Sequence, residues 1–227
     1  MILCGREVLQ NPALFPLTQD SVLLAYFSVP KNGTRVLDLG VGQGYLGILL
    51  REWADCTVDG LELSEKAAAA ARENYLRCAV PGNVLTCDWR DLPRDRVERY
   101  VLCVANPPYF PASAGPAGKH RLARTAGADM AETLCRAAAR ALQNGGRFCL
   151  CCPPERLPDW LCALRSVGVE PKRLRPVIQQ TGTPPCLLLL EGKKGGKPGM
   201  RWLKPLALKT RSGVPTSELK AIYGGTK

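Results

Sequence analysis

Histidine is almost absent from this chain of 227 residues: His120 stands alone, and no stretch of about 18 uncharged apolar residues occurs. The scarcity of histidine excludes a histidine-rich metal centre and leaves little room for acid–base catalysis by an imidazole. The missing apolar run makes a membrane span unexpected, and Arg6 and Glu7 stand where a signal peptide would have its apolar segment. We therefore expect a cytoplasmic protein with no metal.

Paired cysteines are also missing, although cysteine itself is abundant. The 11 cysteines are odd in number and scattered, unlike the disulfide framework of a small secreted domain. Cys149, Cys151 and Cys152 form a cluster without a second ligand pair at the spacing of a zinc site. Their segment, RFCLCC, is instead predicted as a buried strand, in which cysteine behaves as a small apolar residue.

Acidic residues are fewer than basic ones, 20 against 31, and the formal net charge is +11. Residues 191–227 contain 9 basic and 2 acidic residues, so the excess is concentrated in the tail. A basic excess suggests a polyanionic partner, because Lys and Arg release counterions when they meet phosphates. A generically basic protein would have the same charge, so the charge alone leaves both interpretations open.

Apolar runs alternate with helical patterns along the chain. Strands are predicted at 35–40, 57–63, 83–88, 100–106, 147–152 and 186–192. Helices are predicted after Asp20 as N-cap, at 45–54, at 65–80 after Ser64 as N-cap, at 129–143 before Asn144-Gly145-Gly146, and at 155–167. The arginines at 90, 94, 96 and 99 are expected on a solvated helix face. The alternation predicts an α/β fold, a mostly parallel sheet with helices on both faces.

Three regions are expected. Residues 1–34 form an N-terminal segment with a capping helix, 35–192 form the core, and 193–227 form a basic appendage with a strand and a short helix, SELKAIYG. The sequence GKKGGKPG (192–199) is predicted to be a flexible linker or turn, and 107–128 a long loop.

A glycine-rich motif follows the first core strand. Asp38, Gly40, Gly42 and Gly44 stand at its end, where glycine lets the backbone turn sharply and approach a ligand closely. The motif also satisfies the spacing of a dinucleotide-binding loop, so an NAD-dependent dehydrogenase is one hypothesis. Asp38 argues against it, because its carboxylate would repel a pyrophosphate. The same carboxylate would attract the cationic amino-acid end of S-adenosylmethionine.

Acidic residues also end the next two strands. Glu62 can accept hydrogen bonds from both hydroxyls of a ribose, and Leu63 beside it is assigned to the same site. Asp88 is expected to accept from the adenine amino group of the cofactor, with Trp89 beside the ring. These residues and the glycine motif predict a binding site for S-adenosylmethionine.

The motif Asn106-Pro107-Pro108-Tyr109 follows the fourth strand. The lone pair of an exocyclic amino nitrogen is delocalised into its ring, which makes the nitrogen a poor nucleophile. The side-chain carbonyl of Asn106 and the backbone carbonyl of Pro107 can accept its two N–H bonds and free the lone pair for attack on a sulfonium methyl. The prolines fix φ and hold both acceptors rigidly, and Tyr109 can stack on the base. Asn106 is assigned to the cofactor site as well.

With these motifs the chain resembles the class I amino-methyltransferases, and VLDLGVGQG, GLELSEKA and NPPY carry the resemblance. LQNPALFPLTQDSVLLAYF and the second half resemble the bacterial tRNA (adenine-N6)-methyltransferases that modify the adenine beside the anticodon of a valine tRNA. The resemblance implies a Rossmann-like sheet of seven strands, S-adenosylmethionine as cofactor and tRNA as substrate. The oligomeric state remains open.

Basic residues are candidates for contacts with the RNA phosphates. Arg121 and Arg124 follow the NPPY motif, and Lys193, Lys194 and Lys197 are expected to meet the backbone farther out. Two further hypotheses are kept: a protein glutamine N5-methyltransferase, since a side-chain amide is also a planar amino group, and a non-catalytic RNA-binding module. A methylation assay with tRNA and with release-factor protein would separate the glutamine methyltransferase from the tRNA enzyme. Absence of S-adenosylmethionine binding would support the non-catalytic module.

Overall fold

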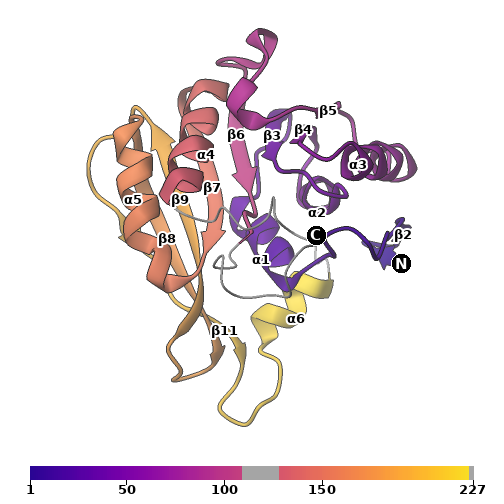
Figure 1. Cartoon of the computed structure of the whole chain (residues 1–227). Helices are drawn as coiled ribbons and strands as arrows, with labels where there is room; N and C mark the ends of the chain where they lie inside the picture. Colours follow the sequence, from indigo (N-terminus) through magenta and orange to yellow (C-terminus); the bar gives the residue numbers. More distant parts are fainter. Residues whose placement is uncertain (109–127, 225–227) are drawn as a thin grey trace, which may run out of the picture.

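The computed structural model describes residues 1–108 and 128–224 and builds them around one central sheet (Figure 1). The strands are β1 (Ile2–Leu3), β2 (Arg6–Glu7), β3 (Thr34–Leu39), β4 (Cys56–Glu62), β5 (Val84–Thr86), β6 (Tyr100–Ala105), β7 (Leu142–Cys152), β8 (Val169–Gln180), β9 (Pro185–Lys194), β10 (Arg201–Trp202) and β11 (Leu206–Lys209). The helices are α1 (Gln19–Ser28), α2 (Tyr45–Trp53), α3 (Glu65–Arg77), α4 (Ala128–Ala141), α5 (Leu157–Ser166) and α6 (Ser217–Gly224).

The central sheet has the order β10-β8-β9-β7-β6-β3-β4-β5, and β11 also pairs with β8. Strands β5, β4, β3, β6 and β7 are parallel neighbours, whereas β9 runs antiparallel to both β7 and β8. The seven strands from β5 to β8 therefore form the mostly parallel sheet that the sequence predicts, and the expected α/β fold is confirmed. Strands β10 and β11, from the expected appendage, extend the sheet at the β8 side.

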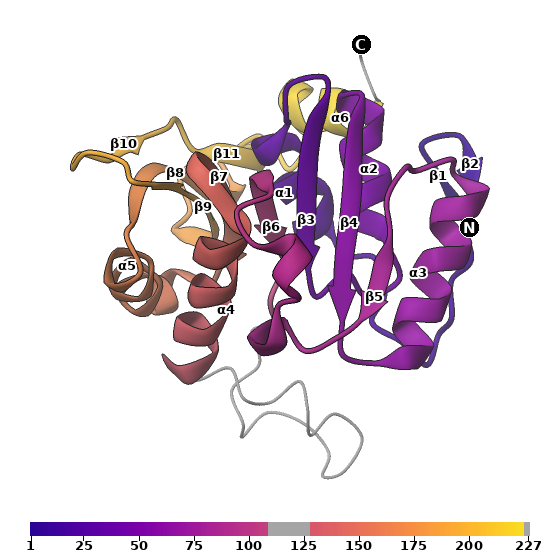
Figure 2. The same ribbon diagram turned by 90° about the horizontal axis from the view of Figure 1, so that it is seen from above.

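Helices cover both faces of the sheet (Figure 2). One apolar cluster joins the sheet to α1, α2, α3 and α6, and a second joins it to α4 and α5. Alanines let α3 approach the sheet closely, since Ala67, Ala68 and Ala71 are all buried. Cys149, Cys151 and Cys152 are fully buried in β7, which confirms the prediction of an apolar strand. Burial raises the pKa of the Cys149 thiol to about 12.

Strand β8 was not predicted as a strand, because two prolines interrupt its pattern. Pro171 lies next to a shift in the register with β9. Pro176 lies between the residues that pair with β10 and those that pair with β11. Proline cannot donate to a ladder, so it is tolerated where pairing is interrupted.

The ends of α1, α3 and α4 can be compared with the ends that the sequence predicts. Asp20 was predicted as an N-cap, but α1 begins at Gln19 and Thr18 is the N-cap, so Asp20 lies in the first turn. Ser64 does cap α3, because its side chain accepts from the backbone N–H of Ala67. Helix α4 ends at Ala141, before the Asn-Gly-Gly sequence, since the next residue already pairs with β6.

Arg96 was expected on a solvated surface, and that prediction is wrong. Its side chain is buried and donates to the Asp59 carboxylate at 2.5 Å and to the Tyr100 hydroxyl at 2.9 Å. Tyr100 in turn donates to Asp59 at 2.9 Å. A buried carboxylate requires such partners, because an unpaired charge in the interior is strongly unfavourable.

The N-terminal segment is fastened to the core by hydrogen bonds. The N–H of Leu9 donates to the side chain of Asn74 on α3 at 2.8 Å. Gln43, in the glycine-rich turn, accepts from the N–H of Asn11 at 2.9 Å and donates to the carbonyl of Phe15 at 2.8 Å. Phe15 is therefore fixed over the carboxyl ends of the central strands.

The helices within residues 1–108 and 128–224 are all too short or too polar to cross a lipid bilayer.

Candidate active site

A pocket of about 410 Å³ opens at the carboxyl ends of β3, β4 and β6. In parallel α/β sheets this edge is where ligands bind, and the volume suits a molecule of cofactor size. The described residues that line it are Phe15, Pro16, Ser21, Asp38, Leu39, Gly40, Val41, Gly42, Gln43, Tyr45, Leu46, Glu62, Leu63, Ser64, Trp89, Asn106, Pro107, Pro108 and Leu134.

The glycine-rich turn forms one wall of the pocket. Gly40, Gly42 and Gly44 have φ of +83°, +55° and +86°, a conformation that other L-residues rarely adopt. A Cβ on Gly44 would lie 2.9 Å from the Tyr75 ring, so the turn also packs tightly against α3. A Cβ on Gly42 would meet no atom of the described residues within 4 Å. The backbone at Gly42 is therefore open to a ligand.

Asp38 lies at the bottom of this wall and is 2% exposed. Among the described residues, none donates a hydrogen bond to its Oδ2 atom. Burial, and then the charge of Glu62, raise the pKa of Asp38 to about 8. A buried acceptor without a donor is unfavourable. A cationic ligand group placed there would supply the missing donor and charge.

Glu62 braces the glycine turn. Its Oε2 accepts from the N–H of Gly42 and its Oε1 from the N–H of Ser64, each at 2.9 Å. These bonds use one lone pair of each oxygen and fix the carboxylate at the pocket wall, with lone pairs left for hydroxyl donors. Leu63, 46% exposed, lines the pocket beside it.

Trp89 and Asp88 are placed differently. The Trp89 ring lies against the glycine turn, 3.6 Å from a Cβ built on Gly40, and it lines the pocket. Asp88 is absent from the pocket lining that the described residues form, and its two oxygens accept from the Arg90 backbone and guanidinium at 2.9 Å. The hydrogen bonds from Arg90 hold the pKa of Asp88 below its usual range. Its contact with a cofactor adenine stays a prediction.

Asn106 directly follows β6, the strand that pairs with β3. The register pairs Asp38 with Val104, so Asn106 stands close to the bottom of the pocket. Its Nδ2 donates to the Ser21 hydroxyl at 2.9 Å and to the Thr18 hydroxyl at 3.4 Å. The Cys151 thiol donates to its Oδ1 at 3.2 Å. The amide is therefore held in one orientation by α1 and β7.

Not every predicted site residue is brought to this pocket. Pro107 and Pro108 line it, whereas Tyr109, Arg121 and Arg124 fall outside the described residues. Lys193 pairs with Arg147 of β7, which in turn pairs with Leu102 near the start of β6, so Lys193 stands towards the opposite edge of the sheet from Asn106. Lys194 and Lys197 follow it at that edge, and Lys194 donates to the carbonyl of Leu142 at 2.8 Å. Their contact with RNA stays a prediction.

Sequence reasoning missed several pocket-lining residues on either side of the glycine-rich motif. Phe15, Pro16 and Ser21 line the pocket from the N-terminal segment and α1, and Gln43 and Tyr45 from the turn and α2. The signal for the first three was the resemblance of LQNPALFPLTQDSVLLAYF to known enzymes, which pointed to no particular side chain.

The residues present fit S-adenosylmethionine. Asp38, whose Oδ2 has no donor among the described residues, suits its ammonium group, and the fixed Glu62 suits the ribose hydroxyls. Trp89 offers an aromatic surface beside them. Within residues 1–108 and 128–224, no group of three or more His, Cys, Asp or Glu side chains is placed to hold a metal ion.

Known proteins share both sequence and fold with this chain. Residues 18–155 match the family described as the methyltransferase small domain. A tRNA1(Val) (adenine(37)-N6)-methyltransferase from Dickeya chrysanthemi strain Ech1591 is 32% identical over 187 residues, which cover 78% of this chain and 72% of that protein. A protein of the same name from Bacteroides fragilis strain YCH46 is 29% identical over 175 residues, covering 75% and 74%.

Solved structures share the fold. A protein from Agrobacterium tumefaciens described as a predicted O-methyltransferase superposes with a TM-score of 0.72 at 21% identity, covering 91% of this chain and 96% of that one. The 16S rRNA N2 G1207 methyltransferase RsmC from Thermus thermophilus, solved with AdoMet and guanosine, gives a TM-score of 0.58 at 22% identity, covering 80% and 45%.

Proposed function

The chain belongs to the methyltransferase small domain family and is an S-adenosylmethionine-dependent methyltransferase, and we propose that it methylates the N6 amino nitrogen of an adenine in the anticodon loop of a tRNA. The enzyme class excludes the dehydrogenase and the non-catalytic module that the sequence left open. The relatives named above as tRNA1(Val) (adenine(37)-N6)-methyltransferases support the choice of substrate.

The observation that carries the proposal is the position of Asn106. It shares one pocket with Asp38 and the glycine turn, because β3 and β6 are parallel neighbours and end at the same edge. A planar amide in the wall of the cofactor pocket suits a substrate that must be held by its own N–H groups. The cofactor supplies an electrophilic methyl group on a sulfonium when bound.

The amide of Asn106 is prepared to act as an acceptor. Ser21 and Thr18 occupy its nitrogen, which leaves the carbonyl oxygen directed elsewhere. That oxygen accepts from the Cys151 thiol at 3.2 Å, and in the complex with RNA it is the proposed acceptor for an amino hydrogen of the target base. The backbone carbonyl of Pro107 is the proposed second acceptor, held by the fixed φ of proline. Both bonds localise the nitrogen lone pair for attack.

Loss of the amine proton needs no dedicated base. No histidine is among the described residues that line the pocket. Once methylated, the nitrogen carries a positive charge and is acidic enough to release its proton to water. Phe15 and Pro16 line the pocket, and Gln43 holds this segment by donating to the Phe15 carbonyl at 2.8 Å.

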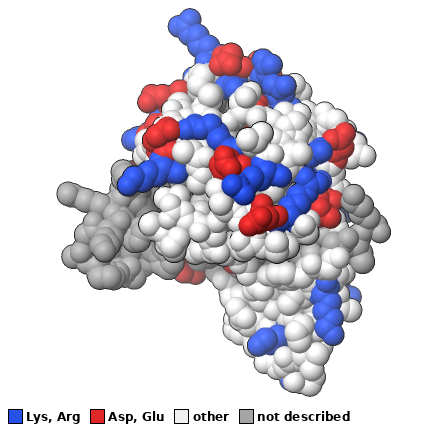
Figure 3. Space-filling view, turned by 90° about the vertical axis from the view of Figure 1, so that its right-hand side faces the viewer, with Lys and Arg blue, Asp and Glu red and all other residues white. Residues whose placement is uncertain are grey.

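Positive charge near this edge suits an RNA substrate. On the face shown in Figure 3, Lys and Arg mix with Asp and Glu over the upper part, whereas the charged residues visible on the projection at the lower end are all Lys or Arg. Lys209 pairs with Gln180 at the carboxyl end of β8, which is the edge that also holds Asn106, and Arg211 follows it. We assign phosphate contacts to these two exposed residues.

The proposal is tested by mass spectrometry of nucleosides after incubation with S-adenosylmethionine and unmodified tRNA. The expected product is N6-methyladenosine. A parallel incubation with release-factor protein tests the glutamine alternative. Methylated glutamine together with unmodified adenosine would refute the proposed substrate and leave the enzyme class standing.

A further inference from the structure

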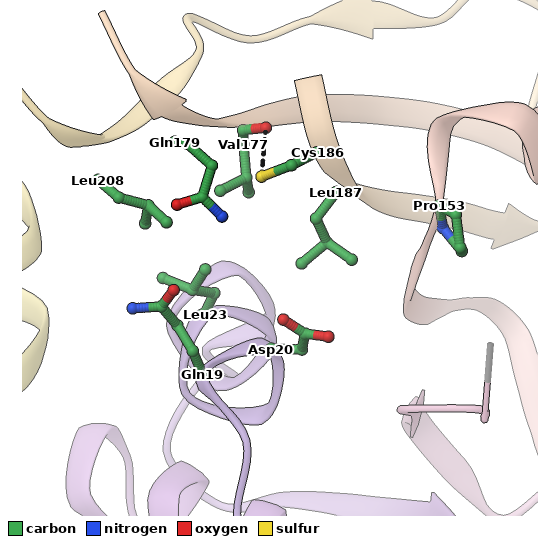
Figure 4. Close-up of a pocket in the computed structure, with 9 residues that line it drawn as sticks. All are labelled: Gln19, Asp20, Leu23, Pro153, Val177, Gln179, Cys186, Leu187 and Leu208. Atoms are coloured by element: carbon green, nitrogen blue, oxygen red, sulfur yellow. Dashed lines mark hydrogen bonds between the residues drawn. The ribbon is translucent and has the colours of Figure 1, made fainter. Parts of the chain in front are cut away.

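A second, smaller pocket of about 160 Å³ lies beside the first one. Figure 4 shows its walls: Gln19, Asp20 and Leu23 of α1 on one side, Val177, Gln179, Cys186 and Leu187 of β8 and β9 on the other, with Pro153 and Leu208 at the ends. Leu23 and Val177 are almost fully buried and form an apolar floor. The side chains of Asp20 and Gln179 point from opposite walls into the space between them (Figure 4).

This pocket and the cofactor pocket share the first turn of α1. Asp20 lines the small pocket, and the next residue, Ser21, lines the large one and accepts from Asn106 at 2.9 Å. Consecutive Cα atoms are about 3.8 Å apart. Pro153 follows β7 directly, two residues after Cys151, whose thiol contacts Asn106. The small pocket is therefore an immediate neighbour of the proposed transfer site.

The chemistry of the pocket is that of a site for one flat, polar-edged ring. Its volume is close to that of an engineered cavity of about 150 Å³ that holds benzene. Within the part of the chain that the structure describes, the Asp20 carboxylate receives no hydrogen bond and forms no ion pair. Burial raises the pKa of Asp20. A phosphate would be repelled by this carboxylate, whereas a ring N–H or amino group would be attracted.

We propose that this second pocket binds the base of a nucleotide next to the target adenine, with an amino group of that base donating to Asp20. Gln179, on the opposite wall, can donate to or accept from another atom of the same base edge. RNA is read in this way, by hydrogen bonds to the edges of unstacked bases. Uracil fits poorly, because both neighbours of its ring N–H are carbonyls that face the carboxylate. The inference rests on the proposed function, since it requires an RNA substrate.

The test uses the full chain and RNA stem-loops with one target adenine. Each of the four bases is placed in turn directly 5′ and directly 3′ of that adenine, and kcat/KM is measured for every stem-loop. Wild type should prefer one or more amino-bearing bases over uracil at one of the two positions by roughly tenfold or more, as expected for a good base contact. Asp20→Asn should reduce that ratio to near one, because an amide can also donate to the uracil carbonyls.

Controls separate a specific effect from a general one. Asp55→Asn makes the same change at an exposed carboxylate far from the pocket and should keep the wild-type preference. Gln179→Ala, at an exposed position, should weaken the preference without altering S-adenosylmethionine binding. An unchanged base preference in both Asp20→Asn and Gln179→Ala, with RNA methylation intact, would overturn the subsite alone. Absence of RNA methylation by the wild-type protein would overturn the proposed function and the subsite with it.

Discussion

Replacing Asp38 by Asn should stabilise the cofactor-free protein and strongly weaken its affinity for the cofactor. The carboxyl is 2% exposed, and its pKa rises from the usual 3.8 to about 8 on folding. Each unit of pKa shift corresponds to about 1.4 kcal/mol, so ionising Asp38 in the cofactor-free protein opposes folding by roughly 6 kcal/mol at most. Burial of the Asn amide offsets about 1–3 kcal/mol of the gain. The variant should therefore be more stable at pH 8 by roughly 3 kcal/mol.

The sign of the pH dependence follows from the raised pKa. Between about pH 4 and pH 8 the folded protein keeps a proton on Asp38 that the unfolded chain has lost, so the free energy of unfolding falls as pH rises. The penalty is complete above pH 8. In Asp38→Asn this component is missing, and the difference between variant and wild type should grow from pH 4 to pH 8. Urea denaturation at several pH values measures it.

Cofactor binding should favour the ionised form of Asp38, whereas folding without the cofactor favours the protonated form. Since the ammonium group of S-adenosylmethionine favours the ionised form of Asp38, binding at pH 6.5 should release about one proton. Calorimetric titration in two buffers of different ionisation enthalpy counts that proton. Asp38→Asn should release none and bind at least about a hundredfold more weakly, by analogy with loss of a partner from a buried charge pair. A variant that binds the cofactor as tightly as wild type would refute the reasoning.

Two other substitutions follow from the structure. Arg96→Ala leaves a buried carboxylate poorly paired and should lower the free energy of unfolding by about 3 kcal/mol. Arg94→Ala, at an exposed position, should change the free energy of unfolding by less than about 0.5 kcal/mol. Equal effects of the two substitutions in urea denaturation would contradict the buried placement of Arg96. Replacing both Lys209 and Arg211 by Glu should weaken tRNA binding and reduce its salt dependence by roughly one phosphate contact per residue. Lys193→Glu in the same filter-binding assay tests the separate prediction of an RNA contact at the opposite edge, and unchanged tRNA binding would refute that contact.

The sequence predicted the parts of the site that depend on strand ends. Asp38, Glu62 and Asn106 each follow an apolar run, and the carboxyl ends of parallel strands meet at one edge of the sheet. The sequence did not show on which edge of the sheet Lys193 lies. Strand β9 runs antiparallel to β7, so the last residues of β9 lie at the edge opposite to Asn106. That reversal depends on β8, whose prolines conceal the strand in the sequence.

Contacts between distant segments could not be predicted either. Ser21 accepts a hydrogen bond from Asn106, which is 85 positions away in the sequence, and no local sequence pattern predicts such a pair. Arg96 stands in a run of charged residues that resembles a solvated surface, and only the approach of β4 gives it the buried Asp59 as a partner. Local chemistry was therefore predictable, whereas packing partners were not.

The proposed chemistry requires that the anchored amide of Asn106 act mainly on the methyl-transfer step. Ser21→Ala removes one anchor of that amide, and we expect a smaller loss of rate than from removing the amide itself. Asn32→Ala, at an exposed asparagine away from the pocket, is the matched control and should have wild-type activity.

The most direct measurement is the single-turnover rate of methyl transfer to unmodified tRNA by Asn106→Ala, with cofactor affinity measured in parallel. Loss of an oriented hydrogen-bonding group typically lowers the rate by about 10²–10³. We predict a loss of that size with S-adenosylmethionine affinity close to that of wild type. A variant that transfers the methyl group at the wild-type rate would contradict the mechanism.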